Sequence, residues 1–367
     1  MKIDIITFHN TSNFGATLQC TALFNYLKKQ RHEVQVINYL PVYVTDKKSA
    51  AKELRNVARS KNKVKAAVKG IAYLSKAKEI KERDRRFEEF INSNLSISET
   101  YSTYEDIKSN PPEANLYICG SDQIWNPALT GGELDEAFFL RFTSGRKAAY
   151  GASMGEFEIE EHKDQLRKLT SDFGAISVRE SSTAVRLSAV LEREVSTVLD
   201  CTLLLKKEDY EAMEKPVNTH DSYVLVYDMQ RSSVTDQLAQ NLARQENLKI
   251  IDISPNPFIT HKNSTKMIGI GPGEFLTLVK NAEYVVTNSF HGTVFSIIYG
   301  KQFFSVPHST RSGRVVDLLN SLNLSERLVR SGELQDMNPV NYDIVYSVLE
   351  GTRQGSYAYL NNVLNAQ

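Results

Sequence analysis

The chain has 367 residues, of which 41% are hydrophobic and 24% are charged. This length predicts two or three domains, and the ordinary composition excludes a collagen-like, coiled-coil or wholly disordered chain. No apolar run reaches the ~18 residues of a membrane helix, and Asp4 interrupts the apolar start, so a secretion signal is not expected. Cys20, Cys119 and Cys201 are widely spaced, which predicts free thiols in a cytoplasmic protein and no disulfide framework or zinc knuckle.

The charge of the chain is balanced overall but unevenly distributed. There are 44 basic and 44 acidic residues, and residues 47–86 hold 15 of the basic and 4 of the acidic ones. The neutral total and the scarcity of aromatic residues in this segment argue against nucleic-acid binding. Two interpretations of the segment stay open, a solvated helix or a cationic surface that meets an anionic partner at the inner face of the membrane.

Short apolar runs recur along the chain with helical patterns between several of them. The first series of predicted strands covers residues 3–7, 34–39, 116–119, 148–151, 175–178 and 197–200. The second series, which follows the loop around Pro216, covers residues 223–228, 249–253, 266–269, 283–287 and 303–306. Alternation of strands and helices is typical of parallel sheets joined by right-handed crossovers.

These two series predict an α/β protein with two consecutive Rossmann-like, doubly wound domains. The first is expected over residues 1–210, with a basic helical insertion at about 46–110, and the second over residues 211–340. Residues 341–367 have helical spacing and could pack back on the first domain.

In such sheets ligands bind beyond the carboxyl ends of the strands, so the residues that follow each strand are the candidates. The loop after the first strand contains Asn10 and Asn13, and Gly15 opens the next helix, where free N–H groups suit an anion or a sugar hydroxyl. The alternative is an ordinary capped turn, because asparagine, serine and threonine are common helix caps.

Two further strand ends carry polar side chains. In GSDQIWNP, Ser121 and Asp122 could contact a sugar, Asp122 could accept a proton, and Trp125 could stack on a sugar or anchor the loop. In AISVRESS, Arg179 comes directly after a strand and before a helix, a good place to hold a carboxylate or phosphate. The alternatives are a structural turn at Asp122 and an ion pair at Arg179.

The segment VVTNSFHGTVFSIIYG is the most informative. Asn288 and Ser289 follow a β-branched strand, and His291 and Gly292 start an apolar helix, which favours ligand binding and proton transfer by the histidine. Arg311 and Arg314 stand at the start of another predicted helix and form a second candidate anion site. A metal site is not expected, because no HExxH motif or cluster with ligand spacing is present.

An ordered set of motifs resembles one known family. GSDQIWNP, AAYGAS, ISVRES, VLDCTLLL, TNSFHGTVFSIIYGK and the opening TFHNTSNFGATLQ together resemble the polysaccharide pyruvyltransferases. The resemblance implies a GT-B-like fold and a cytoplasmic enzyme that uses phosphoenolpyruvate as donor substrate, with no further cofactor. It also implies a hexose-containing glycan acceptor, which could be linked to polyprenyl diphosphate, and a pyruvate ketal on two of its hydroxyls.

The resemblance also implies roles for particular residues. The family's important arginine and histidine correspond to Arg179 and His291, and a further basic residue corresponds to Arg311 or Arg314. His291 would protonate the enol carbon, while Asp122 would act as base or sugar contact. VLDCTLLL has Cys201 where the family usually has proline, at what is expected to be a turn after a strand.

Two other functions stay open from the residues alone. A nucleotide-sugar glycosyltransferase of the same fold would need a carboxylate for the ribose, for which Asp228 and Asp252 are the candidates. A non-catalytic glycan-binding protein would be indifferent to phosphoenolpyruvate and to the loss of His291.

Overall fold

The computed structural model describes residues 1–48, 63–155, 157–219, 221–257, 260–308, 313–333 and 338–366. A seven-stranded sheet, entirely parallel, is built from the first part of the chain in the order β3-β2-β1-β4-β5-β6-β7. Its strands are β1 Lys2–Ile6, β2 Glu33–Tyr39, β3 Ile97–Tyr101, β4 Leu116–Gly120, β5 Arg146–Ala152, β6 Ala175–Val178 and β7 Ser196–Thr197.

A second parallel sheet has five strands in the order β10-β9-β8-β11-β12. Its strands are β8 Tyr223–Tyr227, β9 Lys249–Asp252, β10 Ser264–Lys266, β11 Tyr284–Thr287 and β12 Gln302–Ser305. The central strands of both sheets are apolar runs because helices cover both of their faces. The α/β fold expected from the two series of strands is therefore confirmed.

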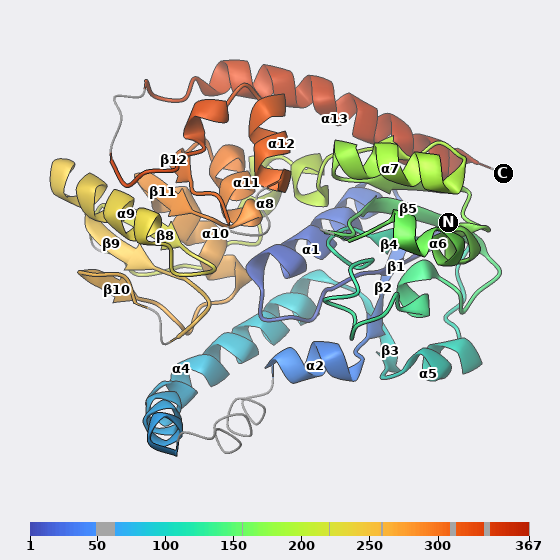
Figure 1. Cartoon of the computed structure of the whole chain (residues 1–367), viewed down its shortest axis with the longest axis horizontal. Helices are drawn as coiled ribbons and strands as arrows, with labels where there is room; N and C mark the ends of the chain where they lie inside the picture. The colour runs from blue at the N-terminus through green and yellow to red at the C-terminus, as the bar shows by residue number, and fades with distance from the viewer. Residues whose placement is uncertain are drawn as a thin grey trace.

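Helices connect the strands of both sheets (Figure 1). They are α1 Phe14–Lys29, α2 Val42–Lys48, α4 Lys63–Asn94, α5 Tyr104–Ser109, α6 Lys163–Thr170, α7 Ser181–Leu191, α8 Lys207–Glu211, α9 Ser233–Gln245, α10 Pro272–Asn281, α11 Phe290–Ile298, α12 Gly313–Ser321 and α13 Tyr342–Asn365. Among these described helices none combines the length and the hydrophobicity that a membrane span requires.

The first helix, α1, lies where the two sheets and their helices meet. It is buried on almost every side, because it packs on its own sheet and also against α10 and α11 of the second one. The ring of Phe14 stacks on Phe275, with the ring centres 4.7 Å apart, and on Phe87 of α4 at 5.3 Å. The apolar core is thus continuous from one sheet to the other.

The predicted helical insertion at 46–110 is only partly correct. Residues 49–62 lie outside the described part of the chain, α4 ends at Asn94, and Ile97–Tyr101 then forms the edge strand β3 instead of continuing the insertion. The sequence ISETY contains few apolar residues because an edge strand buries little of its surface; here only Tyr101 is buried. The pattern of hydrophobic residues could therefore not reveal it.

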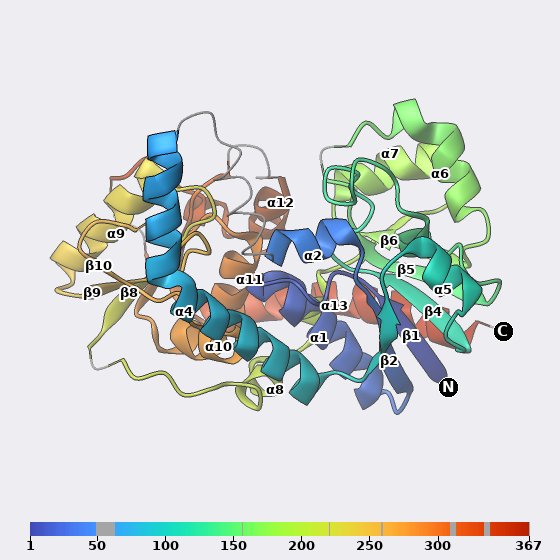
Figure 2. The same cartoon turned by 90° about the horizontal axis from the view of Figure 1, so that it is seen from below.

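Two long helices extend across both halves of the molecule. Helix α4 crosses the underside (Figure 2), where Arg86 forms an ion pair of 2.9 Å with Glu274 of α10. Helix α13 runs over the opposite side (Figure 1) and reaches the first sheet, where Ser356 Oγ accepts a hydrogen bond from Leu199 N and Tyr359 donates one to Ala149 O. Near its start, α13 also contacts the second half, where Tyr342 donates to Lys301 O and Tyr346 donates to Ile297 O, so both long helices connect the two halves of the molecule.

Candidate active site

The candidate site forms where residues that follow strands of both sheets meet around Asp200. Asp200 caps a short 3₁₀ helix after β7, Arg179 follows β6, and His291 lies in the first turn of α11 after β11. Arg179 and His291 are more than a hundred positions apart in the sequence. In the fold, however, His291 Nε2 lies 3.7 Å from Asp200 Oδ2.

The carboxylate of Asp200 is fully buried and accepts several hydrogen bonds. Its Oδ2 accepts from Arg179 Nη1 at 2.6 Å and from Ser121 Oγ at 3.4 Å, and its Oδ1 accepts from the backbone and side chain of Thr202. Burial alone would raise the pKa of Asp200, but the neighbouring His291 and Arg179 outweigh it and hold the pKa well below its usual range. Asp200 is therefore an anion in the folded protein, and it lies beside both the guanidinium group of Arg179 and the imidazole of His291.

His291 is held by close packing against α1. Its Nδ1 lies where a side chain on Gly15 would be, because a β-carbon added at Gly15 would be 2.0 Å from that atom. Its other nitrogen, Nε2, is buried, and no described residue offers it a partner within hydrogen-bond distance. The imidazole is thus positioned with one nitrogen available to a ligand.

Two arginines lie near the ring of Phe290, one from each half of the molecule. The guanidinium carbon of Arg179 lies 5.6 Å from the ring centre and that of Arg314, from α12, lies 5.3 Å from it. Burial, together with the nearby charge of Arg179, lowers the pKa of Arg314 to about 10. The proximity of two buried guanidinium groups favours binding of an anion, which would relieve their mutual repulsion.

The guanidinium group of Arg179 retains unused hydrogen-bonding capacity. Its side chain is 3% exposed, and Nε and Nη2 have no acceptor within hydrogen-bond distance in the described residues. The nearest further carboxylate is that of Asp122, whose Oδ1 lies 3.7 Å from Nη2. Buried N–H groups are normally satisfied, so these two nitrogens indicate the place of a ligand with acceptor oxygens.

The carboxylate of Glu180 lies next to Arg314 at the edge of the candidate site. Glu180 Oε1 accepts a hydrogen bond from Ser153 Oγ at 2.7 Å and lies 3.9 Å from Arg314 Nε. Its second oxygen, Oε2, is buried without a described donor. Glu180 and Asp200 were not among the candidates from the sequence, although Glu180 is next to Arg179 and Asp200 is the last residue of the predicted strand 197–200.

Several predicted ligand contacts are instead engaged within the protein. Asn288 accepts from Met229 N at 2.7 Å and donates to Asp228 at 2.6 Å, Ser289 caps α11 at the amide of Gly292, and Ser121 is fully buried. A β-carbon at Gly292 would lie 2.3 Å from the hydroxyl of Thr287. These residues position the loop that carries His291.

Trp125 is a core residue. Its side chain is fully buried, its ring stacks on Phe139 at 4.8 Å, and its Nε1 donates to the carbonyl of Phe138 at 3.0 Å. The predicted sugar contact of Trp125 is therefore wrong, because no face of the ring is open to a ligand. The alternative interpretation, that it anchors the loop, agrees with this packing.

The remaining candidates differ in their placement. Asn13 caps α1 by accepting from Ala16 N at 3.3 Å, and Asn10 lies partly exposed in the same loop. Arg311 lies outside the described residues. Over the described part of the chain, no group of three or more histidine, cysteine, aspartate or glutamate side chains could hold a metal ion.

A sequence model of the polysaccharide pyruvyl transferase family matches residues 13–310, which is most of the chain. The chain belongs to this family. The match includes each of the residues Gly15, Arg179, Asp200 and His291 around the candidate site. No curated protein matches the sequence.

The fold is similar to that of solved GT-B structures. The UDP-GlcNAc 2-epimerase of Methanocaldococcus jannaschii is 13% identical at a TM-score of 0.51, over 96% of this chain and 93% of that one. A second structure of this epimerase, in complex with UDP-GlcNAc and UDP, is 12% identical at a TM-score of 0.51. The match covers 100% of this chain and 100% of that one. At such low identity the similarity confirms the two-domain GT-B fold and carries no information about the substrate.

Proposed function

We propose that this member of a transferase family moves the pyruvyl group of phosphoenolpyruvate to two hydroxyls of a hexose in a glycan precursor. The observation that supports this most is the buried guanidinium group of Arg179, with two N–H-bearing nitrogens unpaired in the described residues and with Arg314 near the same ring of Phe290. Phosphoenolpyruvate carries a phosphate and a carboxylate, so it matches two adjacent cationic groups.

In the proposed reaction His291 acts as the general acid. Protonation of the methylene carbon of phosphoenolpyruvate creates an oxocarbenium-like centre, to which the first sugar hydroxyl adds. Its proton returns to His291, directly or through Asp122. The C–O bond to phosphate then breaks, the second hydroxyl attacks the same carbon, and its proton leaves with the phosphate. The products are the pyruvate ketal and inorganic phosphate.

The residues around His291 would support this chemistry in distinct ways. Asp200, 3.7 Å from His291 Nε2, would stabilise the imidazolium that is required before proton transfer. The guanidinium groups of Arg179 and Arg314 would stabilise charge on the departing phosphate, more strongly in a buried site than in water. Asp122, 18% exposed, is the carboxylate of this cluster that an acceptor hydroxyl could reach.

The carboxylates that a nucleotide-sugar glycosyltransferase would need for ribose are already engaged. Asp228 accepts from the amides of Gln230 and Ser232 and from Asn288, and Asp252 pairs with Lys266 at 3.2 Å. This arrangement favours pyruvyl transfer over the glycosyltransferase alternative.

A thermal-shift titration of the purified protein with phosphoenolpyruvate, UDP-sugars and GDP-sugars tests the proposal. A ligand that binds only the folded state raises the melting temperature. A shift with phosphoenolpyruvate alone, followed by ketal formation on a hexose acceptor, is the expected result. A shift with a nucleotide sugar alone would contradict the proposal and favour a glycosyltransferase.

We also propose that the basic segment 47–86 meets an anionic partner such as the membrane face or the anionic carrier of the acceptor. Towards its end the charges are compensated, because Arg85 pairs with Glu82 and Glu89 and Arg86 pairs with Glu82 and Glu274. The net positive charge on which this proposal depends is a property of the sequence, because residues 47–73 contain nine basic residues and one acidic residue.

A further inference from the structure

Helix α13 binds the far end of the helix that carries His291. Near the start of α13, the hydroxyl of Tyr346 donates to the carbonyl of Ile297 at 3.1 Å, and that of Tyr342 donates to the carbonyl of Lys301. These carbonyls lie at and just beyond the C-terminal end of α11, where the last carbonyls of a helix have no partner within it. His291 lies in the first turn of the same helix.

Further along, α13 reaches the first half of the molecule (Figure 1) and binds the chain on both sides of Asp200. Ser356 Oγ accepts from the amide of Leu199 at 2.9 Å, and Tyr357 donates to the carbonyl of Leu204 at 2.8 Å. The backbone here is irregular apart from a 3₁₀ helix of four residues, so its polar groups need side chains as partners.

Arg353 of α13 binds the same segment at two further points. Its side chain is 9% exposed, and it donates from Nε to the carbonyl of Leu203 at 2.6 Å and from Nη2 to the carbonyl of Leu205 at 3.2 Å. A guanidinium group is planar and rigid, so one side chain fixes two carbonyls that follow Asp200 by three and five residues. The third nitrogen, Nη1, donates to Glu350 within α13.

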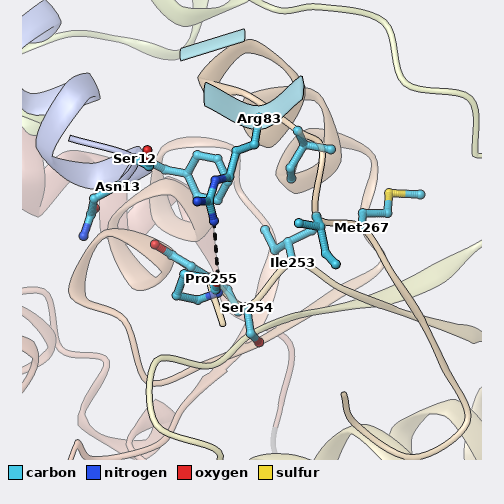
Figure 3. Close-up of a pocket in the computed structure, with 11 residues that line it drawn as sticks. Ser12, Asn13, Arg83, Ile253, Ser254, Pro255 and Met267 are labelled. Atoms are coloured by element: carbon cyan, nitrogen blue, oxygen red, sulfur yellow. Dashed lines mark hydrogen bonds between the residues drawn. The ribbon is translucent and has the colours of Figure 1, made fainter. Parts of the chain in front are cut away.

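Helix α4, which also connects the two halves, contacts other segments. Arg83 Nη1 donates to the carbonyl of Pro255 at 3.3 Å beside a small cavity (Figure 3). The residues that line this cavity belong to α4, to the start of α1 and to loops of the second half. Among the described residues, α13 is the one of these two helices whose side chains form hydrogen bonds with the segments of both Asp200 and His291.

A helix keeps these two sets of contacts at a fixed separation. Tyr346 and Arg353 are seven residues apart, which corresponds to ~10 Å along a helix. Between them Leu349 is fully buried in the core that joins the two sheets, so packing also holds the helix in place. A change at either set of contacts would alter the distance of 3.7 Å between His291 Nε2 and Asp200 Oδ2.

We propose that Arg353 is a positioning residue, which keeps the carboxylate of Asp200 next to His291 by binding the chain at Leu203 and Leu205. This inference rests on the proposed function, because proton transfer by His291 is part of that proposal. Helix α13 begins after residue 310, the last residue of the family match, so the comparison with the family assigns Arg353 no role.

Steady-state kinetics of ketal formation by two variants test the proposal. Arg353→Lys keeps the charge, but an ammonium group cannot bind two carbonyls as a guanidinium does. Its kcat should fall at least ~10-fold, while the KM for phosphoenolpyruvate should change by less than ~2-fold. Tyr357→Phe removes one hydrogen bond and keeps the stacking on Tyr26 at 5.3 Å. Its kcat should fall ~3-fold, and it keeps the test decisive if Arg353→Lys does not fold.

Tyr359→Phe is the matched control. It also removes one hydroxyl of α13, and the lost bond to the carbonyl of Ala149 has the same length of 2.8 Å as that of Tyr357. Ala149 belongs to β5 and not to the segment that contains Asp200. The control should therefore keep its kcat. An equal fall in kcat in Tyr357→Phe and Tyr359→Phe would overturn the inference, because a general loss of stability would then explain both.

A double variant tests whether Arg353 acts through His291. In a His291→Ala background, Arg353→Lys should change the residual kcat by less than ~2-fold, because Asp200 then has no imidazole beside it. An equally large loss of kcat with and without His291 would show that Arg353 acts elsewhere in the fold, and it would overturn the inference.

Amide hydrogen exchange of the ligand-free protein separates the inference from the proposed function. Arg353→Lys should speed exchange in residues 197–206, whereas Tyr359→Phe should not. Faster exchange there in a protein that forms no ketal would overturn pyruvyl transfer and still support Arg353 as the residue that holds Asp200 in place. Unchanged exchange or an unchanged kcat in Arg353→Lys would overturn the inference.

Discussion

Gly15 and His291 are in contact although they belong to helices of different halves of the molecule. The contact has room for a hydrogen atom only, since a β-carbon on Gly15 would lie 2.0 Å from Nδ1 of His291. The imidazole of His291 can therefore take this position only because Gly15, in the neighbouring helix α1, has no side chain. This contact also makes the site depend on the packing of α1 against α11.

Gly15→Ala should displace the imidazole and lower kcat for ketal formation by at least ~10-fold, because small misplacements of a catalytic group are costly. The measurement is steady-state kinetics at saturating phosphoenolpyruvate. The control is Gly355→Ala in α13, where no atom lies within 4 Å of the added carbon. This control should keep full activity and gain ~0.5–1 kcal/mol in free energy of unfolding. Full activity of the Gly15→Ala variant would show that the catalytic position of His291 does not require a glycine at residue 15.

His291→Ala should lower kcat by ~10²–10⁴-fold, the usual contribution of a general acid. Its free energy of unfolding should fall by no more than ~1 kcal/mol, because Asp200 keeps its bonds to Arg179 and Thr202. Single-turnover kinetics and urea unfolding check the two values. Undiminished turnover would exclude a catalytic role for this histidine.

Arg179→Lys should weaken phosphoenolpyruvate binding at least ~10-fold, because an ammonium cannot replace a guanidinium that donates in two directions. Lysine is chosen because it keeps a cation beside the buried Asp200; loss of that charge would cost ~3–5 kcal/mol in stability. Calorimetric titration gives the affinity. A variant with unchanged affinity would show that the donor binds elsewhere.

The buried Asp4 of β1 should make the stability of the protein depend on pH. Neither of its carboxylate oxygens has a hydrogen-bond partner in the described residues, and burial raises its pKa from 3.8 to about 6. The folded state therefore holds the proton more tightly than the unfolded chain. The resulting stabilisation is complete below about pH 4 and is lost as the pH rises through 6.

Asp4→Asn keeps the size of the side chain and removes this titration. At pH 8 the variant should be more stable by ~2–3 kcal/mol, which is the cost of ionising a carboxyl whose pKa burial has raised from 3.8 to about 6. Near pH 4 the two proteins should match. Urea unfolding across this range provides the measurement. A constant difference between them at every pH would show that Asp4 does not titrate between the two states.

The basic segment 47–86 should promote binding to anionic surfaces. Replacing its seven lysines between residues 61 and 81 with glutamine should reduce co-sedimentation with phosphatidylglycerol vesicles, by ~1 kcal/mol for each charge near the surface. Vesicles of neutral lipid are the control. Identical sedimentation of the variant and the unmodified protein would contradict binding to anionic surfaces and favour the alternative interpretation, a solvated helix.

Much of this fold could be predicted from local patterns. Runs such as IDII and LYIC, buried on both faces, have the composition of central parallel strands, and each of the eleven predicted strands is present at or near its expected position. The edge strand at Ile97–Tyr101 was missed because its residues are mostly polar and only Tyr101 is buried. The sugar contact predicted for Trp125 is wrong for a related reason, because the sequence does not show which side chains of a loop pack into the protein core.

Local patterns in the sequence predict the order of the strands and helices along the chain, the positions of Arg179 and His291 after strands, and the motifs typical of the family. The packing of the two halves brings Asp200 next to these two side chains, requires Gly15 to lack a side chain, and places Arg179 and Arg314 near the same ring of Phe290. The physical reason is that strand and helix patterns reflect burial and hydrogen bonding between near neighbours in the chain. Contacts between the two sheets depend on how whole helices pack, which no local pattern encodes.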